Sequence, residues 1–204
     1  MKYLKILIAS LMVVFASLSH AVSVSGNVAL TTDYVWRGMT QNAEDPSISG
    51  GFDLETDMGF YLGTWAANVS GGTSSIELDY YLGFSGAMTE DSGYDVGYIS
   101  FTYPGNDSLD FEELYLTFDF YGVYISYFAG LDDAADNIEI GYGVEAGPGS
   151  FNIAYGDYDT AGQYALIGYD WTVGDFTLGF YYSDFESDAG AASDQDGAYF
   201  TISY

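Results

Sequence analysis

Apolar and polar residues alternate along almost the whole chain beyond residue 21, and this alternation limits the folds available to it. Successive side chains of a strand point to opposite faces, so a period of two predicts strands with one apolar face. In the segment 76–84 the apolar row consists of Ile76, Leu78, Tyr80, Leu82 and Phe84. Acidic, small or aromatic residues fill the opposite row, and similar segments recur to the end of the chain.

About twelve segments follow this pattern, and an even number of strands is typical of single-chain bacterial barrels. We therefore predict an all-β protein, a transmembrane antiparallel up-and-down β-barrel of about 12 strands. A soluble β-sandwich with the same alternation is the alternative fold. The expected strands lie at 22–36, 48–55, 59–69, 76–85, 94–103, 113–120, 123–128, 138–145, 151–156, 164–171, 176–183 and 198–204. In the first of these, Tyr34 and Trp36 belong to the apolar row and Asp33 and Arg37 to the opposite row.

The connections between these segments alternate between short and long. Compact breaks at 57–59, 121–122, 147–149 and 173–175 contain residues that favour tight turns. Longer polar stretches occupy 38–46, 104–110, 129–137, 157–163 and 184–197. This alternation predicts external loops and periplasmic turns, with both termini in the periplasm. Two connections break the rule, because 86–93 is long for a turn and 70–74 is short for a loop.

The first 21 residues resemble a secretory signal peptide. Lys2 and Lys5 precede an apolar run from Ile6 to Leu18, and Ser19-His20-Ala21 resembles a small-x-small cleavage site. The run is shorter than the roughly 20 residues of an ordinary membrane-spanning helix. We expect cleavage after Ala21, with residues 22–204 forming the barrel domain; a retained N-terminal anchor is the alternative.

The composition beyond residue 21 excludes several kinds of chemistry. That part contains Arg37 as its only basic residue and all 30 acidic residues, so its net charge is −29, and it has neither cysteine nor histidine. Ser-His and Cys-His nucleophile pairs and Cys/His zinc sites are therefore impossible. One arginine cannot neutralise the phosphates of a nucleic acid. We expect no enzymatic activity, no cofactor and no nucleic-acid partner; whether the acidic loops bind calcium stays open.

The polar rows place many carboxylates inside the predicted barrel, with one cation among them. Unpaired charge in a dry interior is very costly, so the interior must be wet, loaded with cations or partly protonated. A barrel of about twelve strands lies between filled eight-stranded barrels and wide porins, and acidic rings favour cations. We expect a narrow aqueous pore. Its predicted lining is Asp33, Arg37, Glu77, Asp79, Glu113 and Glu139 toward the outside, and Asp53, Glu55, Asp95, Asp119, Glu145 and Asp170 toward the periplasm.

Several short motifs resemble a known family. Thr31 to Gly38 reads TTDYVWRG and is followed by Thr40-Gln41, which resembles the N-terminal hallmark of the TorF family of porins, a group of conserved hypothetical outer-membrane proteins. The motifs IELDYY at 76–81, YDVGY at 94–98 and TYPG at 102–105 resemble the middle section of that family. The resemblance implies an outer-membrane barrel with a porin role. The scarcity of basic residues departs from the family and argues against unselective permeability.

We therefore hypothesise an outer-membrane porin of a Gram-negative bacterium, with a narrow, cation-preferring channel for passive diffusion of small solutes. The alternative is a non-conducting structural or surface-binding barrel whose acidic loops bind divalent cations or a partner. Expected partners are outer-membrane lipid, lipopolysaccharide, and small cations or small solutes. The barrel-assembly machinery is expected to recognise the C-terminal apolar row of Ala198, Phe200, Ile202 and Tyr204.

Overall fold

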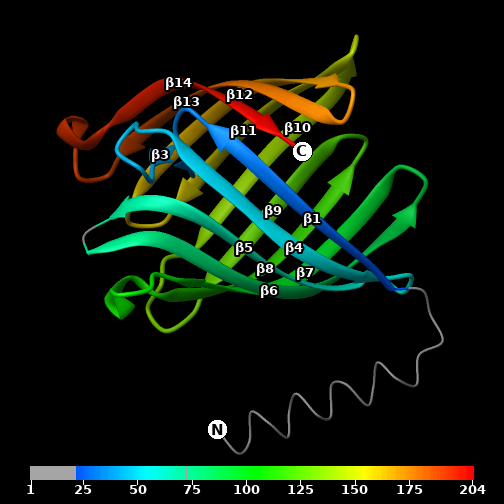
Figure 1. Cartoon of the computed structure of the whole chain (residues 1–204), viewed down its shortest axis with the longest axis horizontal. Coiled ribbons are helices and arrows are strands. Elements are labelled where there is room, and N and C mark those ends of the chain that lie inside the picture. Colours follow the sequence, from blue (N-terminus) through cyan, green and yellow to red (C-terminus); the bar gives the residue numbers. More distant parts are fainter. Residues whose placement is uncertain (1–21, 72) are drawn as a thin grey trace, which may run out of the picture.

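The chain folds into a closed antiparallel barrel of twelve strands (Figure 1). The structure, a computed structural model, describes residues 22–71 and 73–204, so the predicted signal peptide lies outside the described residues. This architecture confirms the predicted up-and-down barrel. Its strands are β1 (Val22–Thr31), β4 (Ser47–Thr56), β5 (Phe60–Gly71), β6 (Ser74–Thr89), β7 (Ser92–Thr102), β8 (Phe111–Phe120), β9 (Val123–Gly130), β10 (Asn137–Ala146), β11 (Gly149–Tyr158), β12 (Gly162–Val173), β13 (Phe176–Ser187) and β14 (Gln195–Ser203).

The apolar row of each strand faces outward. Phe52 on β4 and Val24 on β1 expose 69% and 71% of their surface, and large apolar side chains on β6 to β13 are about half exposed. The polar rows face inward, where Glu77, Asp79 and Glu113 are buried. A water-soluble domain buries its apolar rows, so this inversion fits a barrel whose outer surface meets lipid and contradicts the sandwich alternative. In the part of the chain that the structure describes, no helix is long and apolar enough to span a membrane.

The predicted turns lie at one end of the barrel and the predicted loops at the other, but the loop expected at 157–163 is reduced to residues 159–161. One end carries the short turns at 57–59, 90–91, 121–122, 147–148 and 174–175, together with the start of β1 and the end of β14. The expected long connection at 86–93 is wrong, because β6 runs on to Thr89 through a register shift between Ala87 and Thr89. Only two residues then link β6 to β7, so the exception to the short-turn rule disappears.

The barrel closes through a short seam between β1 and β14. β1 pairs with β4 along its whole length, from Val22 to Thr31, but with β14 only from Ala29 to Thr31. Beyond those three positions, the backbones of Val28 and Tyr204 exchange two hydrogen bonds of 2.9 and 3.1 Å. The first half of β1 therefore has a strand neighbour on one side only.

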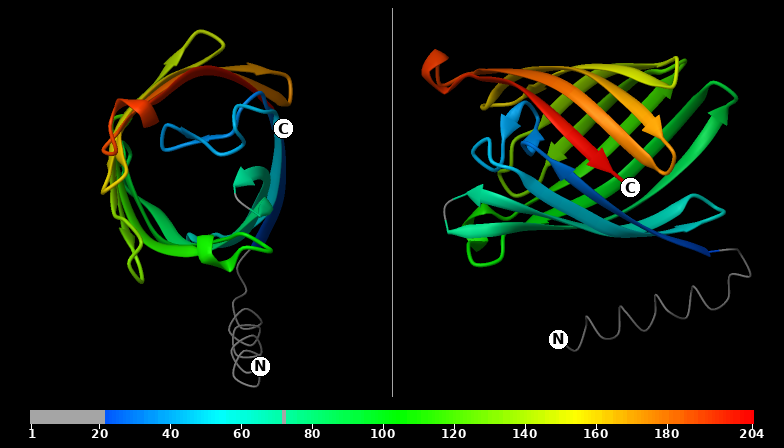
Figure 2. Two further views of the ribbon diagram at one scale, coloured as in Figure 1. Left: turned by 90° about the vertical axis from the view of Figure 1, so that its left-hand side faces the viewer. Right: turned by 45° about the horizontal axis from the view of Figure 1, so that its top comes forward.

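Residues 32–46, which we call the inner segment, leave the wall and cross the inside of the barrel (Figure 2). The first strand was predicted to continue to Trp36, but it ends at Thr31, and the inner segment forms a small hairpin of β2 (Val35–Trp36) and β3 (Met39–Thr40). Arg37 and Gly38 join these strands, and both have positive φ, as in a type I′ turn. The assignment of Tyr34 and Trp36 to the lipid-facing row is therefore wrong.

Candidate functional site

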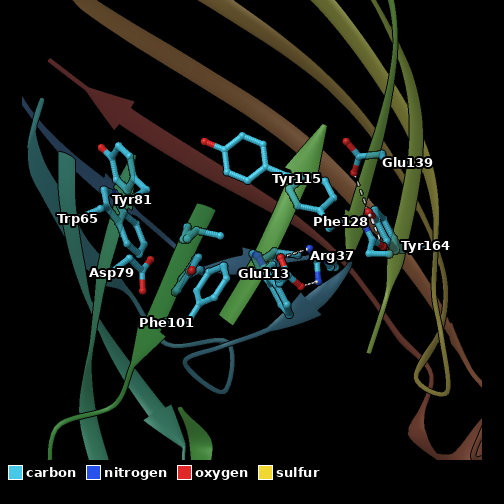
Figure 3. A pocket seen from close by; sticks show the side chains of 15 residues that line it. Arg37, Trp65, Asp79, Tyr81, Phe101, Glu113, Tyr115, Phe128, Glu139 and Tyr164 are labelled. Carbon is cyan, nitrogen blue, oxygen red and sulfur yellow. Dashed lines mark hydrogen bonds and ion pairs between the residues drawn. The ribbon is translucent and has the colours of Figure 1, made fainter. Parts of the chain in front are cut away.

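Arg37 forms a bidentate ion pair inside the barrel. Its Nη1 and Nη2 donate to Oε1 and Oε2 of Glu113 on β8 at 2.7 and 2.8 Å, and the two side chains expose 6% and 0% of their surface (Figure 3). A first strand continuing past Thr31, as predicted, would have placed Arg37 in the barrel wall. Arg37 lies instead against β8, because the inner segment carries it across the lumen.

Aromatic rings surround this ion pair and anchor the tip of the inner segment. The Arg37 guanidinium lies 4.2 Å from the ring centre of Trp36, 4.7 Å from that of Tyr158 and 4.9 Å from that of Phe128. Trp36 in turn packs edge-on against Tyr158 and Phe101 at 5.5 and 5.8 Å between ring centres. Low-dielectric surroundings strengthen a hydrogen-bonded ion pair and make either partner costly to lose. The inner segment is thus held by charge and packing together.

Tyrosine hydroxyls are the main partners of the inward carboxylates, an arrangement that our sequence analysis missed. Glu77 accepts hydrogen bonds from Tyr34 and Tyr103, and Glu139 from Tyr124 and Tyr164, all at 2.7 Å. Further pairs join Tyr61 to Asp95, Tyr81 to Asp53 and Tyr181 to Asp170. Tyrosine is a neutral donor, so it satisfies a carboxylate without cancelling its charge.

Two of these tyrosines lie outside the barrel strands. Burial and the nearby charge of Glu77 raise the pKa of the Tyr34 and Tyr103 hydroxyls well above the ordinary value. Both hydroxyls therefore keep their proton at neutral pH and can serve as donors.

Six inward tyrosines lie over glycines that are their direct partners on a neighbouring strand. A Cβ at any of these glycines would overlap the ring of the facing tyrosine. The absent side chain therefore lets each ring lie flat against the wall and point its hydroxyl toward an acid or another hydroxyl. The pairs are Tyr61 with Gly83, Tyr81 with Gly63, Tyr115 with Gly97, Tyr124 with Gly141, Tyr164 with Gly156 and Tyr181 with Gly168.

The twelve residues predicted to line the pore fall into three groups. Four of them line one internal cavity of about 510 Å³: Arg37, Asp79, Glu113 and Glu139. Asp33, in the inner segment, accepts a 2.6 Å hydrogen bond from Thr40, while Glu77, Asp53, Asp95 and Asp170 bond to the tyrosines named above. Glu55, Asp119 and Glu145 are exposed near the short-turn end of the barrel. Whether these residues line a permeation path stays a prediction.

The cavity has an aromatic wall beside its charged groups. In Figure 3, Trp65, Tyr81, Asp79 and Phe101 lie together on one side, and Glu139 and Tyr164 lie on the other, with Arg37 and Glu113 between them. Among residues 22–71 and 73–204, no group of three or more acidic side chains has the arrangement of a metal site.

The closed twelve-stranded barrel with an outward apolar surface and an acidic lumen defines a porin-like class of protein. A solved structure described as KdgM porin shares this fold, with a TM-score of 0.66 over 87% of this chain and 98% of that chain, at 6% sequence identity. The model of the Gcw_chp family, described as bacterial proteins of unknown function, matches residues 16–202, and the chain belongs to this family. No curated protein matches the sequence. The resemblance to the TorF family stays a prediction.

Proposed function

We propose that this protein is an outer-membrane porin whose narrow channel lets small solutes diffuse passively and prefers cations. The closed barrel, its lipid-compatible outer surface and its likeness in fold to KdgM porin support the porin role. Export through a cleaved signal peptide is part of the same proposal and rests on the sequence of residues 1–21.

The observation that carries the cation preference is the state of Arg37. In the described part of the chain this side chain is the only cation, and both of its outer nitrogens are bound to Glu113. Most of the other inward carboxylates accept hydrogen bonds from neutral tyrosine hydroxyls, and Asp79 has no partner among the described residues, so the protein does not balance their negative charge. A lumen of one sign concentrates counter-ions, over a range of about 8–10 Å at physiological salt.

A second candidate function is a barrel that does not conduct. The inner segment crosses the lumen, and a buried ion pair and three rings hold its tip against the far wall. These contacts favour a permanently narrowed outer half. In this reading the protein acts through its surface, where its acidic loops would bind divalent cations or a partner.

Conductance of the purified protein in a planar bilayer tests both candidates. For the porin we expect discrete channel events and a reversal potential of cationic sign in a salt gradient, which shrinks as salt rises because the charges are screened. Absence of channel events at every salt concentration would contradict the porin and favour the non-conducting barrel.

Neutralising variants test which acids set the preference. Replacing the six periplasmic-side acids with Asn or Gln should move the reversal potential toward zero: Asp53, Glu55, Asp95, Asp119, Glu145 and Asp170. The charge-matched control neutralises six exposed loop acids at the other end of the barrel: Asp107, Asp132, Asp133, Asp159, Asp188 and Asp194. An equal shift in both variants would mean that net charge, and not the lumen, determines selectivity.

A further inference from the structure

Asp79 is a buried carboxylate without a partner among residues 22–71 and 73–204, and it is set between two aromatic side chains. It lies on β6, is 4% exposed and lines the 510 Å³ cavity. Its direct partners on the neighbouring strands are Trp65 of β5 and Phe101 of β7. Directly opposed side chains on one face of a sheet have Cβ atoms about 4.5–5.5 Å apart, so both rings flank the carboxylate (Figure 3).

The inner segment adds two more rings to this part of the cavity. Tyr34 packs edge-on against Trp65 with 5.3 Å between ring centres, and Trp36 packs against Phe101 at 5.8 Å. Both residues also line the cavity. Asp79 therefore faces a space with several aromatic walls.

The lack of a partner separates Asp79 from the other inward acids. Glu77, two residues away on the same face of β6, accepts two tyrosine hydroxyls, and Glu113 binds Arg37 through both oxygens. Oδ1 of Asp79 is completely buried and has no hydrogen-bond partner among the described residues. An uncompensated buried carboxylate is strongly unfavourable, so the site calls for a proton, a cation or another hydrogen-bond donor.

Among the described residues, the other buried side-chain atom without a partner is Nδ2 of Asn137, which belongs to a neutral amide. The single O–H proton of Tyr164 is taken by Glu139 at 2.7 Å, while Asn137 lies 3.2 Å from the same oxygen. Turning the Asn137 amide by 180° makes Nδ2 a donor to that oxygen and leaves only the neutral carbonyl oxygen unpaired. Asp79 has no such remedy, since turning a carboxylate only exchanges two equivalent oxygens and leaves the buried one without a donor.

We propose that Asp79, Trp65 and Phe101 form a binding site for the ammonium group of a small organic amine. The N–H groups of a primary ammonium supply the donor that the Asp79 carboxylate lacks, and the flanking rings attract the same positive charge through their faces. A metal ion fits less well, because hard cations need several oxygen ligands and this site offers one carboxylate among rings. The inference rests on the proposed channel, of which this site would be a selectivity element in the lumen.

The test uses the detergent-folded barrel and titrates it with butylammonium, with neutral butanol as the comparison. We expect butylammonium to bind at least tenfold more tightly than butanol, and Asp79→Asn to remove this difference. Asp79→Asn deletes a buried charge that has no partner, so the variant should fold at least as well as the wild type. Isothermal calorimetry reports binding, and a change in tryptophan fluorescence that is lost in Trp65→Phe reports occupancy next to the carboxylate.

Asp170→Asn is the matched control, because it removes one lumen charge from an acid that Tyr181 and Asn152 already satisfy. This variant should bind butylammonium within about twofold of the wild type. Equal weakening by Asp79→Asn and Asp170→Asn would overturn the proposed site and indicate attraction by lumen charge in general. Calorimetry measures binding whether or not the barrel conducts. A bilayer recording without channel events would therefore contradict the proposed porin, and the calorimetric result would still decide on the binding site.

Discussion

At the scale of single residues, Arg37 is the one basic side chain beyond residue 21, and it is buried inside the barrel. Its guanidinium binds Glu113 through two nitrogens and lies over three rings, so only 6% of the side chain is left exposed to a solute in the cavity. Its backbone also adopts a positive φ of 48° at the tip of the hairpin. These contacts indicate a structural lock more than a solute-binding group.

Arg37→Ala should therefore destabilise the barrel, because it leaves the fully buried Glu113 without a counter-charge. Breaking a buried pair in this way costs about 3–5 kcal/mol. Urea titration of the detergent-folded protein, followed by tryptophan fluorescence, measures the loss. The combined variant Arg37→Ala with Glu113→Gln should lose less than the sum of the two single variants. Unchanged stability of Arg37→Ala with reduced solute flux would instead assign a solute-binding role to Arg37.

The tyrosine partners of the acids could not be predicted from one strand at a time. Glu77 and Asp79 were correctly placed on one face of the same strand, but their surroundings differ because Tyr34 and Tyr103 come from connections to other strands. Such contacts depend on the register between strands and on the path of the loops. The alternation within one strand gives no information on either. The recurring glycines on the inward face were the available signal for these tyrosines, because a ring that lies flat against the neighbouring strand needs a position without a side chain.

At the scale of elements, the strands were predicted well and the inner segment was not. Alternation correctly places β4, β6 and β10 within a few residues, because one face of each meets lipid and the other the lumen. The same alternation continues past Thr31 through Tyr34 and Trp36. A sequence period of two shows that the two faces of a strand differ, but it does not show which environment each face contacts. The apolar residues of the inner segment therefore could not be distinguished by sequence from a lipid-facing row.

Packing between β9 and β10 offers a test of the tyrosine-over-glycine arrangement. Gly141→Ala should cost about 1–3 kcal/mol, because the new methyl group would overlap the ring of Tyr124. Gly197→Ala on β14 is the matched control, since a Cβ there meets no atom within 4 Å, and it should change stability by less than about 0.5 kcal/mol. Urea midpoints measure both effects. The cost of Gly141→Ala should vanish in a Tyr124→Ala background, and a persistent cost would contradict the packing explanation.

At the scale of the whole molecule, twelve strands and the sorting of turns and loops to opposite ends were predictable, whereas the unequal strength of the strand pairs was not. β12 and β13 pair at twelve positions, but β1 and β14 at only three. The reason is the stagger of the closing strands, which brings Tyr204 next to Val28, in the middle of β1. We infer that the barrel opens first at this seam when it unfolds.

The burial of the inner segment also determines how a protease meets this protein. Trypsin cuts after lysine or arginine, and beyond residue 21 the only such bond joins Arg37 to Gly38. Both residues lie at the tip of the hairpin, Gly38 is buried and the Arg37 side chain is 6% exposed. The folded barrel should survive trypsin intact, while the unfolded chain should give fragments ending at residue 37 and starting at residue 38, as mass spectrometry would record. Rapid cleavage of the folded barrel would show that the inner segment leaves the lumen. Cleavage of the Arg37–Gly38 bond therefore reports where the inner segment lies.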